Sequence, residues 1–308
     1  MLAFQGRSTT GRGRQMGSLS RARLFGLMAV VLWSTAATAF KLSLRFCSAY
    51  QLTLVSSIVS LLFLVCYLAV SGKLRLLLDR GTMSGAWLRG FINPFVYYLV
   101  LLGAYSRIPA QIAMVINYLW PVMLVLLSAL VLRQRIRGRD LGGMALSFSG
   151  VVVLSALGSG GGGAGPDPAG LALALGSTLI WALYWILNMK AEGEPAARLA
   201  GNFAWGVAYL FAWGLLRGGA GLSGLPVQAL IGASWVGLFE MGLTYVVWLE
   251  ALRLARSTAD VGSLIYLTPF ASLAFIGLVA HEAVRPATLA GLVLVLAGLR
   301  IQGASRRL

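Results

Sequence analysis

The sequence predicts an all-α membrane protein whose chain crosses the bilayer ten times. Hydrophobic residues make up 58% of the 308 positions and charged residues only 11%, whereas about a quarter of the residues of a soluble domain are charged. The apolar residues gather into stretches of about 20, the length that a helix needs to cross the hydrocarbon layer. These long stretches exclude a lipid-facing β-barrel, because its strands would be shorter and would alternate between apolar and polar residues.

Ten apolar stretches follow one another along the chain and define two units of five helices. The polar residues 1–21 predict a disordered tail, the Gly-rich segment 158–167 predicts a flexible linker, and residues 304–308 form a short C-terminal tail. The first unit covers residues 22–157 and the second covers residues 168–303. The predicted spans are 24–43, 49–70, 86–105, 109–131, 140–157, 168–188, 199–216, 228–249, 259–280 and 286–302.

The basic residues of the connections predict the direction of the spans. With a cytoplasmic N-terminus, the cytoplasmic segments hold 19 of the 25 Lys and Arg residues, the external segments hold five, and Arg89 lies within a span. We therefore expect a multi-pass protein of the inner (plasma) membrane with both termini in the cytoplasm and the linker 158–167 in the periplasm. Such anchors for anionic headgroups account for the net charge of +16, and no basic patch indicates nucleic-acid binding. The alternative for the start is a signal peptide cleaved near Ala37-Thr38-Ala39, which would remove one span.

The two units repeat one another at an offset of 148 residues. Because each unit has an odd number of spans, the second unit enters the membrane from the opposite side, and a two-fold axis in the membrane plane relates the two. This inverted repeat is typical of alternating-access transporters, whose substrate site lies near the midplane between the repeats. The matching pairs are Trp33/Trp181, Trp87/Trp235, Tyr97/Tyr245, Tyr118/Tyr266, Leu119/Leu267, Pro121/Pro269, Gly143/Gly291 and Gly150/Gly298.

Several of these motifs resemble the drug/metabolite transporter superfamily. The motifs are Leu32-Trp-Ser-Thr35, the Tyr-Leu-x-Pro of residues 118–121 and 266–269, and the Gly-rich fifth and tenth spans. The resemblance covers about residues 22–303 and is greatest to the EamA-type ten-helix exporters, aromatic amino acid exporters in particular. It implies a central cavity lined mainly by spans 1, 3, 4, 6, 8 and 9, peripheral spans 5 and 10, and export driven by gradients. One departure is Gln134, where the family pattern often has a Glu; its repeat partner Glu282 is kept.

Aromatic and amide side chains within the spans are the candidate substrate-binding residues. Spacings of three, four and seven residues place several of them on shared helix faces. Rings with one polar atom suit a flat, amphipathic solute, through stacking and through cation–π contact with an amine. The alternative is that these side chains serve helix packing and interfacial anchoring. The candidates are Trp33, Asn93, Tyr97, Asn117, Tyr118, Trp181, Trp185, Asn188, Glu240, Tyr245, Trp248 and Tyr266.

Glu240 is the most unusual candidate, because it falls near the middle of the eighth span. A charged group there costs about 2.5–3.5 kcal/mol or more. We expect it to meet a substrate amine or to take up a coupling proton; the alternatives are an ion pair with Arg89 or a structural hydrogen bond. Pro121 and Pro269 interrupt spans four and nine at matching positions, which predicts paired hinges or gates.

Together these features favour a secondary transporter that exports small metabolites by alternating access, amino acids and especially aromatic ones. A multidrug exporter of organic cations would suit the same residues. A passive channel would need a continuous polar stripe, which the spans lack. The single His and the lack of a metal cluster or a nucleophile constellation exclude an enzyme, and no cofactor is expected. The expected partners are a small-molecule substrate and the bilayer, and a homodimer could form through the Gly-rich fifth and tenth helices.

Overall fold

The computed structural model describes residues 9–131, 136–157, 165–189, 191–219, 221–255 and 261–305, and every regular element in these ranges is a helix. Eight apolar segments are long enough to cross a membrane, and two shorter apolar helices lie at 263–278 and 286–302. These ten segments confirm the ten predicted spans, with bounds that differ by at most six residues. Gln134 and most of the predicted linker lie outside the described residues.

Five spans make up the first unit, and three of them are interrupted. The helix that contains the first span begins at Thr9, before the apolar segment itself, so residues 9–21 extend a helix where we predicted a disordered tail; extending a formed helix is easier than starting one. The third span contains a π-helical turn, η2, and short helices η1 (Leu74–Leu78) and α4 (Arg80–Met83) precede it. The elements are α1 (Thr9–Ser34) with α2 (Ala36–Ser43), α3 (Ala49–Val70), α5 (Ala86–Gly90) with η2 (Phe91–Val96) and α6 (Tyr97–Arg107), α7 (Ala110–Asn117) with α8 (Trp120–Val131), and α9 (Gly138–Leu157).

The second unit has the same plan. Its third span again carries a π-helical turn, η3, and its fourth span begins with a 3₁₀ turn, η4. The elements are α10 (Pro168–Met189), α11 (Pro195–Leu216), α12 (Val227–Trp235) with η3 (Val236–Glu240) and α13 (Leu243–Leu254), η4 (Ser263–Leu267) with α15 (Thr268–Leu278), and α16 (Pro286–Ser305).

The packing of α9 on α16 shows how the two units are related. A Cβ atom on Gly143 would lie 2.6 Å from the carbonyl oxygen of Gly298, and one on Gly291 would lie 2.7 Å from that of Gly150. Ser147 Oγ donates to the carbonyl of Val295, 148 residues away, at 3.1 Å. Exchanging each residue for its repeat partner reproduces these contacts, as a two-fold axis between the helices requires. The units are therefore inverted repeats.

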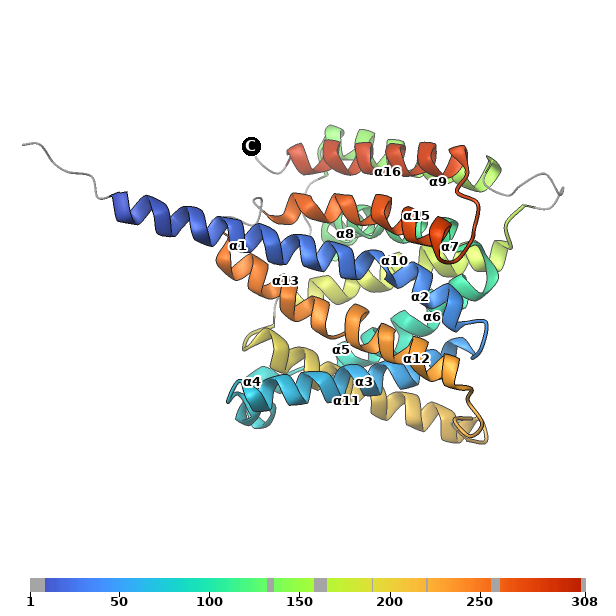
Figure 1. The fold of residues 1–308 in the computed structure, drawn as a ribbon. Helices are drawn as coiled ribbons and strands as arrows, with labels where there is room; N and C mark the ends of the chain where they lie inside the picture. The colour runs from blue at the N-terminus through green and yellow to red at the C-terminus, as the bar shows by residue number, and fades with distance from the viewer. Residues whose placement is uncertain are drawn as a thin grey trace, which may run out of the picture.

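Spans from both units mix in two bundles that the same axis relates. Bundle I contains spans one, eight and nine, because α1 packs on both α13 and α15; bundle II contains spans six, three and four, because α10 packs on α6, α7 and α8. Spans two and seven (α3 and α11) pack together along one edge, and spans five and ten (α9 and α16) along the opposite edge (Figure 1). The cavity described below lies between bundles I and II.

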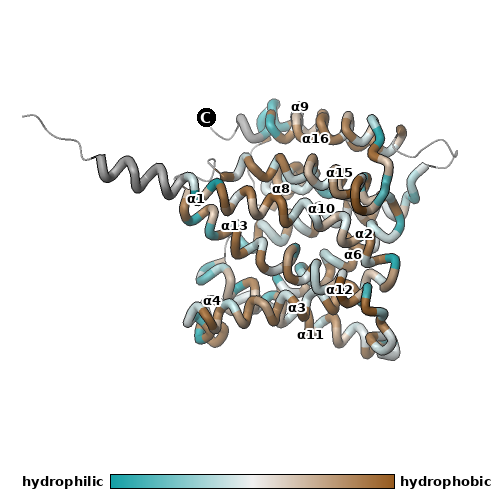
Figure 2. The backbone as a smooth tube through the Cα atoms, in the orientation of Figure 1, coloured by the Kyte–Doolittle hydropathy of each residue, from teal (hydrophilic) through white to brown (hydrophobic). Residues whose placement is uncertain are grey.

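The ends of the helices define two faces. The start of α1 and the end of α16 point to the same side, which we call the terminal face (Figure 1). The connections at 44–48, 108–109, 217–219, 221–226 and 279–285 lie at the other side, the distal face. Hydrophobic residues cover the helices between the faces, and hydrophilic residues concentrate at the helix ends (Figure 2).

The contact between α9 and α16 also affects the expected homodimer. Four glycines of the two helices that we expected to form the dimer, Gly143, Gly150, Gly291 and Gly298, already pack against the other helix of the same chain. Gly142, by contrast, faces open space. A dimer through these helices would therefore have to use their outward, lipid-facing sides.

Candidate functional site

A cavity of about 420 Å³ lies between the two bundles, within the usual size range of small-molecule sites, about 300–1,000 Å³. Its lining is mostly apolar and aromatic, with a few polar groups. The lining residues are Trp33, Ala36, Ala37, Phe40, Tyr97, Leu101, Tyr105, Met114, Asn117, Tyr118, Trp120, Trp181, Trp185, Glu240, Tyr245, Trp248, Leu249, Leu252, Ile265, Thr268 and Ser272.

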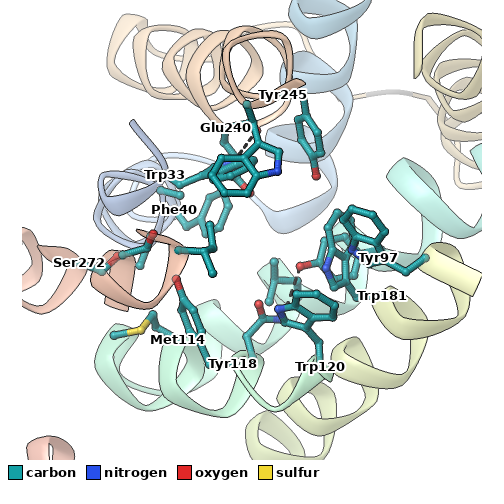
Figure 3. Close-up of a pocket in the computed structure, with 18 of the residues that line it drawn as sticks. Trp33, Phe40, Tyr97, Met114, Tyr118, Trp120, Trp181, Glu240, Tyr245 and Ser272 are labelled. Carbon is teal, nitrogen blue, oxygen red and sulfur yellow. Dashed lines mark hydrogen bonds between the residues drawn. The ribbon is translucent and has the colours of Figure 1, made fainter. Parts of the chain in front are cut away.

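Two aromatic pairs, related by the repeat, face each other across the cavity. Trp33 meets Tyr245 edge to face in bundle I, with ring centroids 5.6 Å apart. Trp181 stacks on Tyr97 in bundle II, at 4.7 Å. The offset of 148 converts one pair into the other, and Figure 3 shows them on opposite sides of the space. A flat ring between them would meet an aromatic surface on both sides.

Glu240 breaks this symmetry, because its repeat partner is Ile92. It is the last residue of the π-helical turn η3, and it lines the cavity beside Trp33 and Tyr245 (Figure 3). Its carboxylate oxygen Oε1 accepts a hydrogen bond from the Tyr98 hydroxyl at 3.4 Å. Among the residues that the structure describes, the cavity lining holds this single carboxylate and no Lys, Arg or His. The site is therefore suited to a group that carries positive charge.

The distal end of the cavity is closed by a set of contacts between the bundles, which we call the distal gate. Lys41 of bundle I donates to the carbonyls of Tyr105 and Ile108, at 3.1 and 3.0 Å, at the end of α6. Glu282 accepts from the Ala110 N–H at 3.0 and 3.2 Å, at the start of α7, and its carboxylate lies 4.0 Å from Lys41 Nζ. The two side chains thus hold both ends of the turn that joins spans three and four of bundle II.

Three further contacts help to close the distal gate. Gln111 donates to the carbonyl of Ala283 at 2.9 Å and accepts from Thr288 Oγ1 at 2.6 Å. The Phe40 ring packs edge to face on Tyr105, with centroids 5.2 Å apart. At the other end, the lining continues to Leu252 and Ile265, near the terminal-face ends of their helices. The cavity therefore extends toward the terminal face.

Comparison with known proteins identifies the family. The model of the EamA-like transporter family matches residues 20–156 and 168–302, once for each unit. The chain belongs to the EamA-like transporter family. This EamA protein is therefore a multi-pass membrane protein of a transporter family.

Named relatives agree with this assignment. The chain is 26% identical over 238 residues to the "Aromatic amino acid exporter YddG" of Ancylobacter novellus, which covers 75% of this chain and 79% of that one. It is 27% identical to the "Uncharacterized transporter YvbV" of Bacillus subtilis, with 92% of each chain covered. A solved crystal structure superposes with a TM-score of 0.64 at 22% identity, over 94% of this chain and 98% of that chain, and supports the fold alone.

The cavity of this EamA protein brings together nine of the twelve candidate residues. Three candidates lie elsewhere. The side-chain amide of Asn188 donates to the carbonyl of Tyr184 at 2.8 Å, and Asn93 is buried inside the π-helical turn η2. Tyr266 is 38% exposed on the 3₁₀ turn η4. The nine that line the cavity are Trp33, Tyr97, Asn117, Tyr118, Trp181, Trp185, Glu240, Tyr245 and Trp248.

Several residues that line the cavity or contact its carboxylate were missed in the sequence analysis. Leu101 and Tyr105 continue the face of Tyr97 at i+4 and i+8, so helical spacing could have found them. Trp120 lies inside the repeated Tyr-Leu-x-Pro motif. No local pattern points to Tyr98, because its role comes from the neighbouring bundle.

The ion pair between Arg89 and Glu240, which the sequence left open, does not form. Arg89 is buried and its Nε donates to the side-chain oxygen of Asn202 at 3.2 Å. Arg89 lies in α5 before the π-helical turn, whereas Glu240 faces the cavity. The correct partner of Glu240 is Tyr98.

The two prolines lie where their spans break. Pro121 is the second residue of α8, after the interruption at Tyr118 and Leu119, and Pro269 is in the first turn of α15, after η4. A proline in the first turn of a helix costs no backbone hydrogen bond. The sequence therefore predicted the breaks correctly, and their use as hinges stays a prediction.

Proposed function

We propose that this EamA protein is a secondary transporter that exports small metabolites by alternating access, amino acids and especially aromatic ones. The observation that carries the proposal is the pair of repeat-related aromatic walls with one carboxylate beside the Trp33 and Tyr245 wall. The aromatic amino acid exporter among the relatives supports the same class of substrate. Alternating access follows from an inverted repeat whose cavity is closed at one end by contacts between its bundles.

The direction of transport rests on the distribution of charge. We infer that the terminal face is cytoplasmic, because basic residues concentrate there, and that the protein lies in the inner membrane. The cavity then takes up its substrate from the cytoplasm, as an exporter must. Among the described side chains, the terminal face carries Arg21, Arg23, Lys73, Arg75, Arg80, Arg137, Arg139, Arg198, Arg253 and Arg300, and the distal face carries Lys41, Arg45, Arg107, Arg217 and Arg285.

An aromatic amino acid matches the cavity group by group. The ring fits between the Trp33 and Trp181 walls, where stacking and cation–π contact are both available. The ammonium group meets Glu240. The hydroxyl of Ser272 can donate to the carboxylate, as can the amide of Asn117 once it gives up its long, 3.5 Å hydrogen bond to the Tyr97 hydroxyl. Neither donor carries a charge, so the carboxylate is recognised by hydrogen bonds alone.

A second candidate is an exporter of organic cations. One observation favours it: within the described ranges of the chain, the cavity lining offers a carboxylate and no basic side chain. The carboxylate of an amino acid loses its water on entry and finds no opposite charge, which costs free energy. An aromatic amine without a carboxylate avoids this cost.

Counterflow into proteoliposomes distinguishes the two candidates. We expect labelled tryptophan or phenylalanine to exchange, and competition by tryptamine to measure how much the carboxylate weakens binding. Exchange of tryptamine and of quaternary ammonium ions without any amino acid would overturn the amino acid assignment. Exchange of none of these compounds, with the protein shown to be folded, would overturn the proposed function.

The role of Glu240 is tested by E240Q, which keeps the shape of the side chain and removes its charge. Charged hydrogen bonds contribute about 1.5–3 kcal/mol, so we expect amine binding to weaken about 10- to 100-fold. If Glu240 also couples transport to protons, a pH gradient drives exchange in the wild type and not in E240Q. The matched control is E250Q, since Glu250 pairs with Arg253 at 2.7 Å and does not line the cavity. The titratable groups around Glu240 are the phenols of Tyr97, Tyr98, Tyr105, Tyr118 and Tyr245.

A further inference from the structure

The contact between Tyr98 and Glu240 crosses from one bundle to the other. Tyr98 belongs to α6 of bundle II and is 1% exposed, whereas Glu240 belongs to η3 of bundle I. Among the described residues, Tyr98 is the polar side chain that meets the Glu240 carboxylate. Any movement that separates the bundles at this level must break this hydrogen bond.

The ring of Tyr98 continues the connection to the distal gate. It packs edge to face on Phe40, with centroids 6.5 Å apart, and Phe40 packs on Tyr105. The next residue after Phe40 is Lys41, whose ammonium group holds the carbonyls of Tyr105 and Ile108. A continuous chain of contacts thus joins the carboxylate in the cavity to the charged part of the gate.

The hydrogen bond itself is suited to being replaced. Its length of 3.4 Å exceeds the 2.5–3.0 Å of a strong O–H···O hydrogen bond. An ammonium group that enters the cavity can donate a shorter, charge-assisted hydrogen bond to the same carboxylate. Binding of an amine therefore competes with a contact that holds the bundles together.

We propose that Tyr98 is the positioning residue through which occupancy of Glu240 controls the distal gate. This proposal rests on the proposed function, because it takes an amine as the ligand of Glu240. When the cavity is empty, the hydrogen bond from Tyr98 to Glu240 connects bundle II to bundle I, next to Phe40, and keeps the distal gate closed. When an amine binds Glu240, the Tyr98 hydroxyl is released and the bundles can separate at the distal face.

A cysteine inside the cavity reports whether the gate is open. We use Ala37→Cys, a buried position in the cavity lining, in a background with Cys47→Ser and Cys66→Ala. A membrane-impermeant thiol reagent is added on the distal face of oriented proteoliposomes. The rate of labelling then measures how often the distal gate opens, with and without tryptamine.

The variant that tests the proposal is Y98F, which keeps the ring against Phe40 and removes the hydroxyl. In the protein that keeps Tyr98, we expect tryptamine to raise the labelling rate about 5- to 150-fold, which is the usual range of coupling between a ligand and a conformational change. In Y98F, we expect fast labelling without ligand and no further rise with tryptamine. Because coupling is reciprocal, tryptamine binding, followed by quenching of Trp fluorescence, should become tighter by up to the same factor, since the amine no longer displaces the Tyr98 hydroxyl. The matched control is Y209F on α11, whose ring packs against Phe91 and Phe95 away from the cavity.

Three results would overturn the proposal. The first is slow labelling of ligand-free Y98F at the wild-type rate. The second is a full tryptamine-induced rise in Y98F. The third is loss of tryptamine binding in Y98F, which would make Tyr98 a ligand-binding residue. If the wild type binds no amine, the proposed function fails, and the ligand-free comparison still decides whether Tyr98 holds the gate.

Discussion

Replacing Lys41 by Met should open the distal gate. Met189, the repeat partner of Lys41, is the residue that the second unit carries at the equivalent position. Met keeps most of the apolar stem and removes the ammonium group, so the packing near Phe40 is conserved while the two hydrogen bonds to Tyr105 and Ile108 are lost. The substitution therefore removes the hydrogen bonds from Lys41 to bundle II and keeps the apolar packing of the side chain.

The size of the effect follows from these contacts. A hydrogen bond from a charged donor contributes about 1.5–3 kcal/mol, and the lower value applies because the Lys41 side chain is 25% exposed. Two such bonds amount to about 3 kcal/mol. The ion pair with Glu282, at 4.0 Å and partly exposed, adds less than about 1 kcal/mol. Since about 1.4 kcal/mol corresponds to a factor of ten, the open fraction should rise roughly 100-fold.

Labelling of Ala37→Cys from the distal face measures this fraction. We expect K41M to label roughly 100-fold faster than its parent without any ligand. R45M is the matched control, because Arg45 is a cation of the same face whose Nη2 donates to the carbonyl of Ala280 within bundle I. Its labelling rate should change less than about twofold. A rise below about fivefold in K41M, or an equal rise in R45M, would show that the charged contacts do not hold the gate.

Two predictions concern the stability of the fold. G143A should lower the melting temperature, because the new Cβ would lie 2.6 Å from a backbone carbonyl of α16 and overpacking costs about 1–3 kcal/mol; G142A faces open space and should not, and equal melting temperatures would contradict the helix contact. On the terminal face, the carboxylate of Glu194 accepts a hydrogen bond from Lys73 at 3.0 Å and raises the pKa of that ammonium group. The pair therefore stabilises the protein up to alkaline pH and is lost as the pH rises through the pKa of Lys73. In thermal melts at neutral pH, K73Q should cost less than about 1 kcal/mol, because the pair is partly exposed, and a larger loss would indicate another role for Lys73.

The spans and the repeat were predictable because each depends on local composition. About 20 apolar residues suffice to predict a spanning helix, whatever the helix packs against. Trp33 and Trp181, or Tyr97 and Tyr245, match at one offset because both units keep the same residues at the cavity. The structure confirms this pairing in the two facing walls.

The helix faces were predictable only where the helices are regular. Asn93 and Tyr97 share a face in an ideal α-helix, which made both of them candidates. In the structure, Asn93 lies inside the π-helical turn η2 and Tyr97 begins the α-helix after it. A π-helical turn contains more residues than an α-helical one and rotates the side chains before it relative to those after it. Asn93 is therefore buried and does not contribute to the cavity that Tyr97 lines.

By itself, the sequence determined the number of spans, the inversion of the two units and the aromatic character of the midplane. These properties follow from apolar length, from an odd number of spans and from residue types that recur at a constant offset. Only the tertiary structure decided that Glu240 meets Tyr98 rather than Arg89, and that the cavity is closed at the distal face. Such contacts join segments far apart in the chain, and they depend on how two bundles lie against each other. The hydrophobic pattern of the sequence does not determine that arrangement, because the same apolar faces would be buried whichever end of the cavity were closed.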